Sequence, residues 1–77
     1  MNKARRKALD NIWGKIIEVT EELRCVLEEE QDCFENIPES FEGTERYETS
    51  ENAIYEMEEI IGNLEDACDS LSEIVEV

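Results

Sequence analysis

Apolar residues in the first half of the chain recur at alternating steps of three and four, which is the spacing of a helix face that packs against another helix. The positions of this main row are Leu9, Ile12, Ile16, Val19, Leu23, Val26, Cys33 and Ile37. The pattern breaks only at Glu30, where an apolar residue is expected. Pro38 disfavours helical geometry at the residue before it, so we predict a first helix over about residues 3–36.

The second half repeats this arrangement, which predicts a second helix over about residues 50–75. Its main row consists of Ala53, Met57, Ile60, Leu64, Ala67, Leu71 and Ile74. Each helix also carries a flanking row at seven-residue steps beside its main row. The flanking rows are Trp13, Thr20, Leu27 and Phe34 in the first helix, and Ile54, Ile61, Cys68 and Val75 in the second.

The connector over residues 37–49 is long for a helical hairpin, so we expect residues 38–41 to form a helical turn and Thr44 or Ser50 to cap the second helix. Two long helices joined in this way are antiparallel neighbours, with their main rows in contact. The predicted layers are Leu9 with Ile74, Ile12 with Leu71, Ile16 with Ala67, Val19 with Leu64, Leu23 with Ile60, and Val26 with Met57. The predicted fold is therefore all-α, a single coiled-coil-like hairpin domain over residues 1–77.

In this arrangement the flanking rows of both helices fall on one side of the hairpin. Neither helix covers that side. The uncovered apolar strip contains Trp13, Leu27, Phe34, Ile54, Ile61, Cys68 and Val75. Such a strip exceeds the apolar surface that monomers usually expose, and two helices alone bury little surface. We therefore predict a homodimer that forms a four-helix bundle, with helices of a target protein as the competing occupant of the strip.

Acidic residues outnumber basic ones by 22 to 7, which gives a net charge of −15. The basic cluster from Lys3 to Lys7 is expected to lie beside the negative end of the second helix. A surface this acidic repels nucleic acid and anionic membranes, and it favours a basic protein partner. The acidic rows expected to carry such a contact are Glu51, Glu58 and Glu65; Glu59, Asp66 and Glu73; and Glu28, Asp32 and Glu35.

This density of negative charge has two interpretations. A dimer of two such hairpins approaches the charge density of duplex DNA, about one charge per 1.7 Å, and would fit the basic groove of a nucleic-acid-binding protein. The other interpretation is a solvated surface that keeps a small bundle soluble.

The sequence carries no catalytic or metal-binding motif. It contains no histidine, the commonest general base and metal ligand, and Cys25, Cys33 and Cys68 lack the spacing of a zinc site. The acidic run from Glu28 to Asp32 lacks the alternation and the glycine of a calcium loop. We therefore expect a protein that is not an enzyme and binds no cofactor or metal. The odd cysteine count and the absence of an apolar stretch of about 20 residues predict a cytoplasmic protein without a membrane span.

Glu30 occupies a position where the main row expects an apolar side chain. It is either a buried functional carboxylate or a structural residue that pairs with Arg46 or accepts a hydrogen bond from Ser50 or Thr49. We favour the structural role, and we expect Arg46 to form an ion pair near the connector.

The segment from Glu28 to Arg46 has a characteristic order of residues. It contains Glu28, Glu29, Glu30, Gln31 and Asp32, then Phe34 and Asn36, then Pro38, Glu39 and Ser40, and finally Gly43, Thr44, Glu45 and Arg46. This order resembles short, acidic, helical proteins of bacteriophages and mobile elements, mostly in Firmicutes. The resemblance implies a phage or prophage context, with the cytoplasm of a bacterial host as the place of action, and a helical hairpin. It supplies no catalytic residues.

Together these features predict a non-catalytic protein-binding module. Its most concrete form is an acidic inhibitor from a phage or mobile element that mimics nucleic acid and blocks a host defence or nucleic-acid-binding protein. The alternative is a structural or assembly module that docks through its apolar strip in a larger phage or cellular complex. If neither surface binds the partner, the connector is the remaining contact, through Pro38, Glu39, Ser40 and Arg46.

Overall fold

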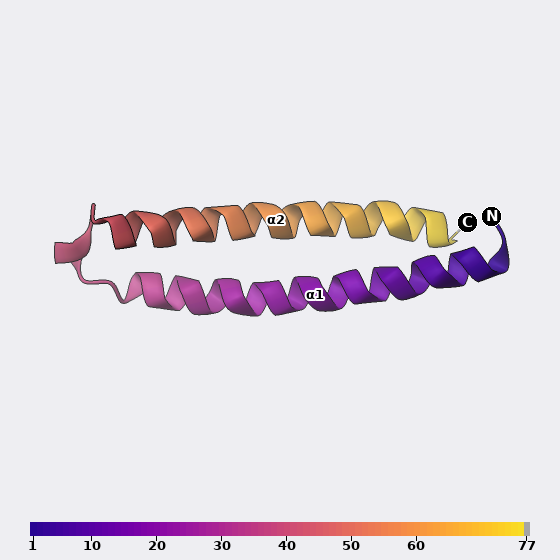
Figure 1. Ribbon diagram of the computed structural model, residues 1–77, viewed down its shortest axis with the longest axis horizontal. Helices are drawn as coiled ribbons and strands as arrows, with labels where there is room; N and C mark the ends of the chain where they lie inside the picture. Colours follow the sequence, from indigo (N-terminus) through magenta and orange to yellow (C-terminus); the bar gives the residue numbers. More distant parts are fainter. Residues whose placement is uncertain (77) are drawn as a thin grey trace.

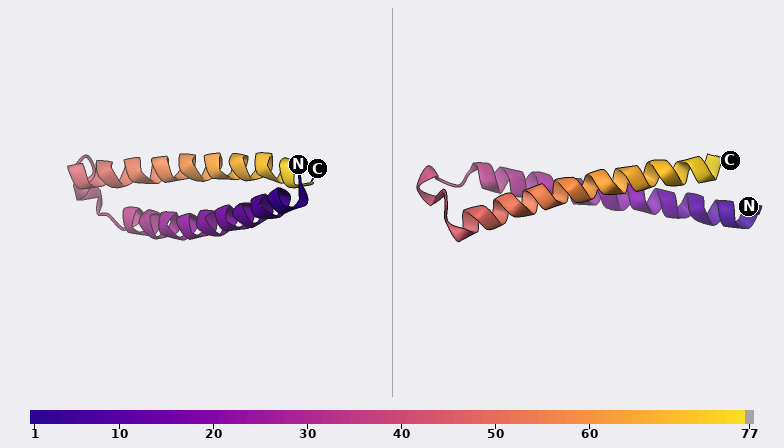
Figure 2. Two further views of the ribbon diagram at one scale, coloured as in Figure 1. Left: turned by 45° about the vertical axis from the view of Figure 1, so that its right-hand side comes forward. Right: turned by 90° about the horizontal axis from the view of Figure 1, so that it is seen from above.

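The computed structural model describes residues 1–76, which form two long helices lying side by side (Figure 1). Helix α1 spans Lys3–Glu35, a short 3-10 helix η1 spans Glu39–Phe41, and helix α2 spans Glu45–Glu76. The helices run antiparallel, with the connector at one end and both termini at the other, and they cross when seen from above (Figure 2). The predicted all-α hairpin is confirmed, as a rod of 60 × 15 × 14 Å.

Both ends of α1 are stabilised by side chains that hydrogen-bond to the backbone. The side-chain oxygen of Asn2 accepts a hydrogen bond from the backbone N–H of Arg5 at 2.8 Å, which satisfies a donor that the first turn leaves free. At the other end, the side-chain amide of Asn36 donates to the carbonyl of Asp32 at 2.9 Å. Pro38 cannot continue the helix, so α1 ends close to the predicted boundary.

The connector contains the helical turn that its length predicts. η1 begins directly after Pro38, whose φ of −60° suits the entry into a turn. Gly43 follows with a φ of +81°, a left-handed conformation that other residues disfavour. The hydroxyl of Thr44 then accepts a hydrogen bond from the backbone N–H of Tyr47 at 3.3 Å. This cap starts α2 at Glu45, earlier than the predicted start near residue 50.

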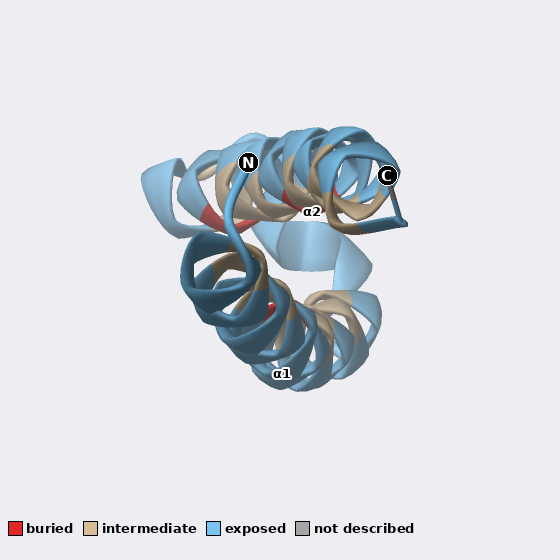
Figure 3. Ribbon diagram, turned by 90° about the vertical axis from the view of Figure 1, so that its right-hand side faces the viewer, coloured by how far each residue is buried: buried red, intermediate tan, exposed pale blue. Residues whose placement is uncertain are grey.

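The two helices bury the sides that face each other, and most other surfaces are exposed (Figure 3). Ile61 is the most buried apolar side chain at 4% exposure, and Thr20 of α1 is equally buried. The Thr20 hydroxyl donates to the carbonyl of Ile16 at 2.6 Å, so its burial leaves no polar group unpaired. The interface rows are Leu9, Ile16 and Leu23 with Trp13, Thr20, Leu27 and Phe34 in α1, and Met57, Leu64 and Leu71 with Ile54, Ile61, Cys68 and Val75 in α2.

The apolar strip that was expected to remain uncovered lies between the helices instead. Its members, all half-buried or buried, are Trp13, Leu27, Phe34, Ile54, Ile61, Cys68 and Val75. That prediction is wrong, and so are the predicted layers, because one member of every predicted pair is exposed. The exposed members are Ile12, Val19, Val26, Ile60, Ala67 and Ile74. Each helix is rotated about its axis relative to the prediction, so that its flanking row replaces half of its main row inside the interface.

The sizes of the side chains explain this rotation. The α1 row that turns inward carries two aromatic rings, Trp13 and Phe34, whereas the α2 row that turns outward contains Ala53 and Ala67. Burying the larger side chains removes more apolar surface from water, at about 25 cal/mol per Å². The same rotation brings Arg24 within reach of an acidic residue on α2.

Candidate protein-binding surfaces

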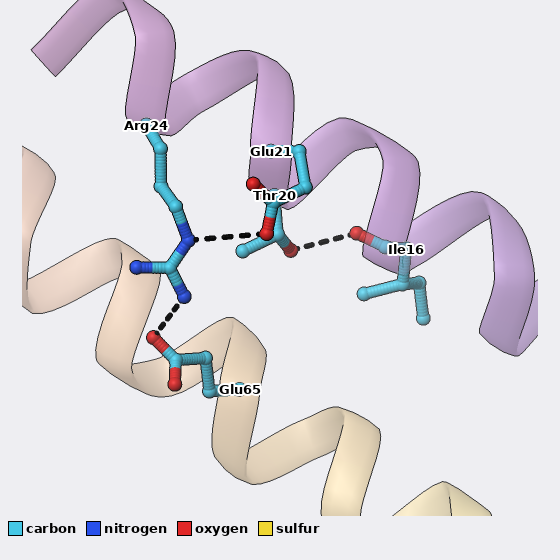
Figure 4. Close-up of polar contacts among 5 residues, drawn as sticks. All are labelled: Ile16, Thr20, Glu21, Arg24 and Glu65. Carbon is cyan, nitrogen blue, oxygen red and sulfur yellow. Dashed lines mark hydrogen bonds and ion pairs between the residues drawn. The ribbon is translucent and has the colours of Figure 1, made fainter. Parts of the chain in front are cut away.

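Polar side chains join the two helices along one flank of the hairpin (Figure 4). Arg24 donates to Glu65 of α2 at 2.5 Å and lies 3.3 Å from Glu21 of its own helix. Further along the flank, the amide of Gln31 donates to Glu58 at 3.2 Å. The hydrogen bond from Arg24 to Glu65 raises the pKa of the guanidinium. These exposed contacts add little stability, because solvent screens them, but they establish which flanks of the two helices adjoin.

The same flank carries carboxylates from both helices, which we call the acidic face. Its members, all exposed, are Glu21, Glu28 and Glu35 of α1 and Glu51, Glu58, Glu65 and Asp69 of α2. Two hollows over this flank are lined by residues of both helices. One hollow is lined by Glu21 and Glu65 and the other by Glu35 and Glu51. The acidic rows of the two helices therefore lie side by side.

The other residues of the predicted acidic surface lie elsewhere on the hairpin. Asp32, Glu59 and Asp66 are exposed on the backs of the helices, since helical periodicity places them opposite the interface rows. Glu73 lines a hollow at the terminal end together with Arg6, the position expected for the basic N-terminal cluster. The Nε atom of Arg6 is buried there and has no hydrogen-bond partner within residues 1–76. The predicted surface is thus divided between one flank and the outer sides of the helices.

Glu30 has the structural role that the sequence favours. Its carboxylate accepts a hydrogen bond from the buried hydroxyl of Ser50 across the interface at 2.6 Å. The predicted ion pair of Arg46 is not formed among the described residues, although Glu30 and Arg46 line the same hollow near the connector. The basic residue that pairs across the helices is Arg24, which the sequence analysis missed. Arg24 is the one basic residue in the acidic stretch between Lys15 and Arg46, and this isolation is the sequence signal for its pairing with a carboxylate.

An aromatic pair closes the connector end of the interface. The ring centroids of Phe34 and Tyr47 lie 4.7 Å apart, with the rings tilted by 38°. Burial raises the pKa of the Tyr47 phenol above its ordinary value of 10.0, and the charges of Glu42 and Glu51 add to this effect. The predicted connector residues, all exposed, are Pro38, Glu39, Ser40 and Arg46. The tip of the rod therefore presents three polar side chains and the exposed ring of Phe41, next to a small aromatic core.

The flank opposite the acidic face carries two uncharged rows, which we call the apolar face. They consist of Ile12, Val19, Val26 and Cys33 of α1 and Ala53, Ile60, Ala67 and Ile74 of α2. The isoleucines and valines among them are between 45% and 53% exposed. Cys33 and Ala53 line the same hollow, so the two rows lie on the same side of the hairpin. Sequence reasoning placed these residues inside the interface and therefore missed this surface.

The three cysteines have different surroundings. Cys25 is exposed on the back of α1, Cys33 is exposed on the apolar face, and Cys68 is half-buried in the interface. Within residues 1–76, no group of three or more carboxylate or thiol side chains is placed to hold a metal ion. No helix of that part of the chain has the length and apolar character needed to cross a membrane. The two extended surfaces of the described chain are the acidic face and the apolar face.

The structure defines an antiparallel helical hairpin with one acidic flank and one apolar flank. Comparisons with protein-family models, with curated proteins and with solved structures gave no match. The resemblance of residues 28–46 to phage proteins stays a prediction.

Proposed function

We propose that this chain is a non-catalytic protein-binding module that uses its acidic face to occupy a basic surface of another protein. The observation that supports the proposal is the alignment of carboxylates from both helices along one flank of the rod. In the context that the resemblance implies, the module is an inhibitor from a phage or mobile element, acting in the cytoplasm of a bacterial host.

The density of charge favours a partner that binds nucleic acid. A net charge of −15 along 60 Å is about one negative charge per 4 Å, and two copies side by side would carry about one per 2 Å. Duplex DNA carries about one per 1.7 Å, so the net charge per length of two copies approaches that of the ligand that a duplex-binding protein recognises. Solvent ions screen such contacts over about 10 Å at 0.1 M salt, so binding should weaken steeply as salt is added.

The test uses a triple variant of the acidic face, Glu28→Gln with Glu35→Gln and Glu51→Gln, which leaves the contacts of Arg24 and Gln31 intact. The unmodified chain and the variant are immobilised, exposed to a bacterial lysate at low salt and eluted with duplex DNA. We expect the unmodified chain to retain nucleic-acid-binding proteins. Duplex DNA should then displace these proteins from the immobilised chain. The variant should retain about tenfold less of them, because the contact is electrostatic.

A matched control separates the geometry of the acidic face from net charge. Glu18→Gln with Glu22→Gln and Glu56→Gln removes the same charge from exposed positions outside the acidic face. This control should retain the same proteins as the unmodified chain. Equal losses from the two triple variants, or retained proteins that duplex DNA does not displace, would contradict the proposal.

The second candidate, an assembly module, was expected to dock through the strip of flanking-row residues. Trp13, Leu27, Phe34, Ile54 and Ile61 lie in the interface between the helices, so that surface is not available. The exposed side chains of Ile12, Val19, Val26, Ile60 and Ile74 belong to the apolar face, and the extent of this face favours a second copy of this chain.

A further inference from the structure

The apolar face is a second extended surface, and the contact of the acidic face with a basic partner does not involve it. We propose that it is covered by a second copy of this chain, in a two-fold dimer whose four helices form one bundle. This inference does not depend on the proposed function, and it uses a different flank from the strip that the sequence predicted.

The single hairpin exposes more surface than a compact monomer of the same mass. Its accessible area is 6084 Å², whereas a compact monomer of 9.0 kDa exposes about 4,850 Å², an excess of about 1,200 Å². Within residues 1–76, Ile61 is the only apolar side chain that the hairpin buries fully enough to count as core. A second layer of helices would supply the core that the single chain lacks.

The area of the apolar side is sufficient for a specific interface. The 33 residues of α1 span about 50 Å at 1.5 Å per residue, and the hairpin is 15 Å wide. Covering this side would bury about 750 Å² of each copy, or about 1,500 Å² in total. Specific interfaces bury about 1,200–2,000 Å², so the contact is large enough for a stable dimer.

The two rows of the apolar face have the same length and the same seven-residue period, so a second copy of this chain can cover both of them at once. The α1 row holds the bulky Ile12, Val19 and Val26, whereas the α2 row alternates alanine and isoleucine at seven-residue steps. A two-fold axis along the rod places the α1 row of one copy against the α2 row of the other. Because both rows repeat every seven residues, the α1 side chains of one copy then meet the alanines and isoleucines of the other in turn, along the whole length of the rows.

Charge does not oppose close contact at this face, because neither row contains a charged residue and the acidic face lies on the other flank. Two copies that each carry −15 still repel at long range, and salt screens this repulsion. The dimer should therefore tighten as salt is added, whereas binding to a basic partner should weaken. Failure of one proposal is thus distinguishable from failure of the other.

Sedimentation equilibrium of the full chain, over a concentration series at low and high salt, tests the dimer. We expect the measured mass to be that of a dimer, twice the 9.0 kDa of one chain. Ile60→Gln should weaken the dimer about tenfold or more, because two-fold symmetry removes two buried isoleucines at once. The matched control is Ile17→Gln, the same change on the opposite flank, where the side chain is 38% exposed against 47% for Ile60. Both side chains are exposed in the hairpin, so helical content by circular dichroism should not change.

The cysteines provide a second measurement on the unmodified chain. Cys33 belongs to the apolar face and Cys25 to the back of α1, and both are exposed in the single hairpin. Alkylation of Cys33 should slow as the chain concentration rises through the dimer range, while alkylation of Cys25 stays constant. A 9.0 kDa monomer at every concentration would overturn the proposal and leave another protein as the occupant. Equal effects of Ile60→Gln and Ile17→Gln, or equal alkylation of the two thiols throughout, would overturn it as well.

Discussion

At the scale of single residues, the interface contains two buried polar side chains, each with a hydrogen-bond partner. The Thr20 hydroxyl donates to a carbonyl of its own helix, so it needs no hydrogen-bond partner from α2. Ser50 donates across the interface to Glu30 and thereby ties one turn of α1 to one turn of α2. Such a pair disfavours other registers of the helices, because a shift would leave the Glu30 carboxylate without its donor.

Removing the donor of this pair should destabilise the hairpin. We expect Ser50→Ala to lower the free energy of unfolding by about 1–2 kcal/mol, because the half-buried carboxylate of Glu30 loses its hydrogen bond. Ser70→Ala makes the same change at an exposed position of α2 and should alter stability by less than about 0.5 kcal/mol. Urea denaturation measures both. If the two losses are equal, water replaces the Ser50 hydroxyl at little cost and the pair does not select the register.

At the scale of elements, periodicity predicts the two helices and half of each main row, and the length of the connector predicts the turn of η1. Both helices carry three adjacent apolar rows, and periodicity alone does not determine which two of them are buried. That choice depends on the volumes of side chains from both helices together and on the contact of Arg24 with Glu65, which are tertiary properties. The members of the acidic face follow from the same rotation. The sequence therefore shows that an acidic surface exists but not which carboxylates share a flank.

The helices have two positions where a small change should strengthen them. Gly14 and Gly62 lie inside α1 and α2, and a Cβ atom added at either would meet no atom within 4 Å. Gly14→Ala and Gly62→Ala should each raise the free energy of unfolding by about 0.5–1 kcal/mol, because glycine loses more backbone entropy in a helix.

Gly43→Ala is the contrasting control for these two variants. The φ of +81° at Gly43 is strained for alanine, so this change should lower the free energy of unfolding by about 1 kcal/mol. Urea denaturation of the three variants compares them directly. Destabilisation by Gly14→Ala or Gly62→Ala would show that these positions contact another surface, in a dimer or in another arrangement of the helices.

At the scale of the whole molecule, the two faces divide the interactions by their physical origin. The acidic face acts through charge, which salt weakens, and the apolar face acts through burial of surface, which salt does not oppose. In the proposed dimer the apolar faces meet in the centre and the acidic faces lie on the two outer sides. Each particle would therefore present two equivalent acidic surfaces to basic partners.

Thermal unfolding tests this division of roles. The midpoint of unfolding should rise with chain concentration, because dimer formation stabilises the folded chain by mass action. It should also rise with NaCl, because screening reduces repulsion among charges that sum to −15. We expect Ile60→Gln to lose the concentration dependence and to keep the salt dependence. A midpoint of the unmodified chain that is independent of concentration would point to a hairpin that stays monomeric, against the proposed dimer.

Both ends of the described chain lie together at one end of the rod, and the connector lies at the other (Figure 1, Figure 2). A hairpin of this form can be inserted into a surface loop of a carrier protein without pulling the ends of that loop apart. The inserted chain would project as an arm 60 Å long with the connector at its tip. It would serve as a spacer of fixed length between the carrier and any binding sequence grafted onto the connector.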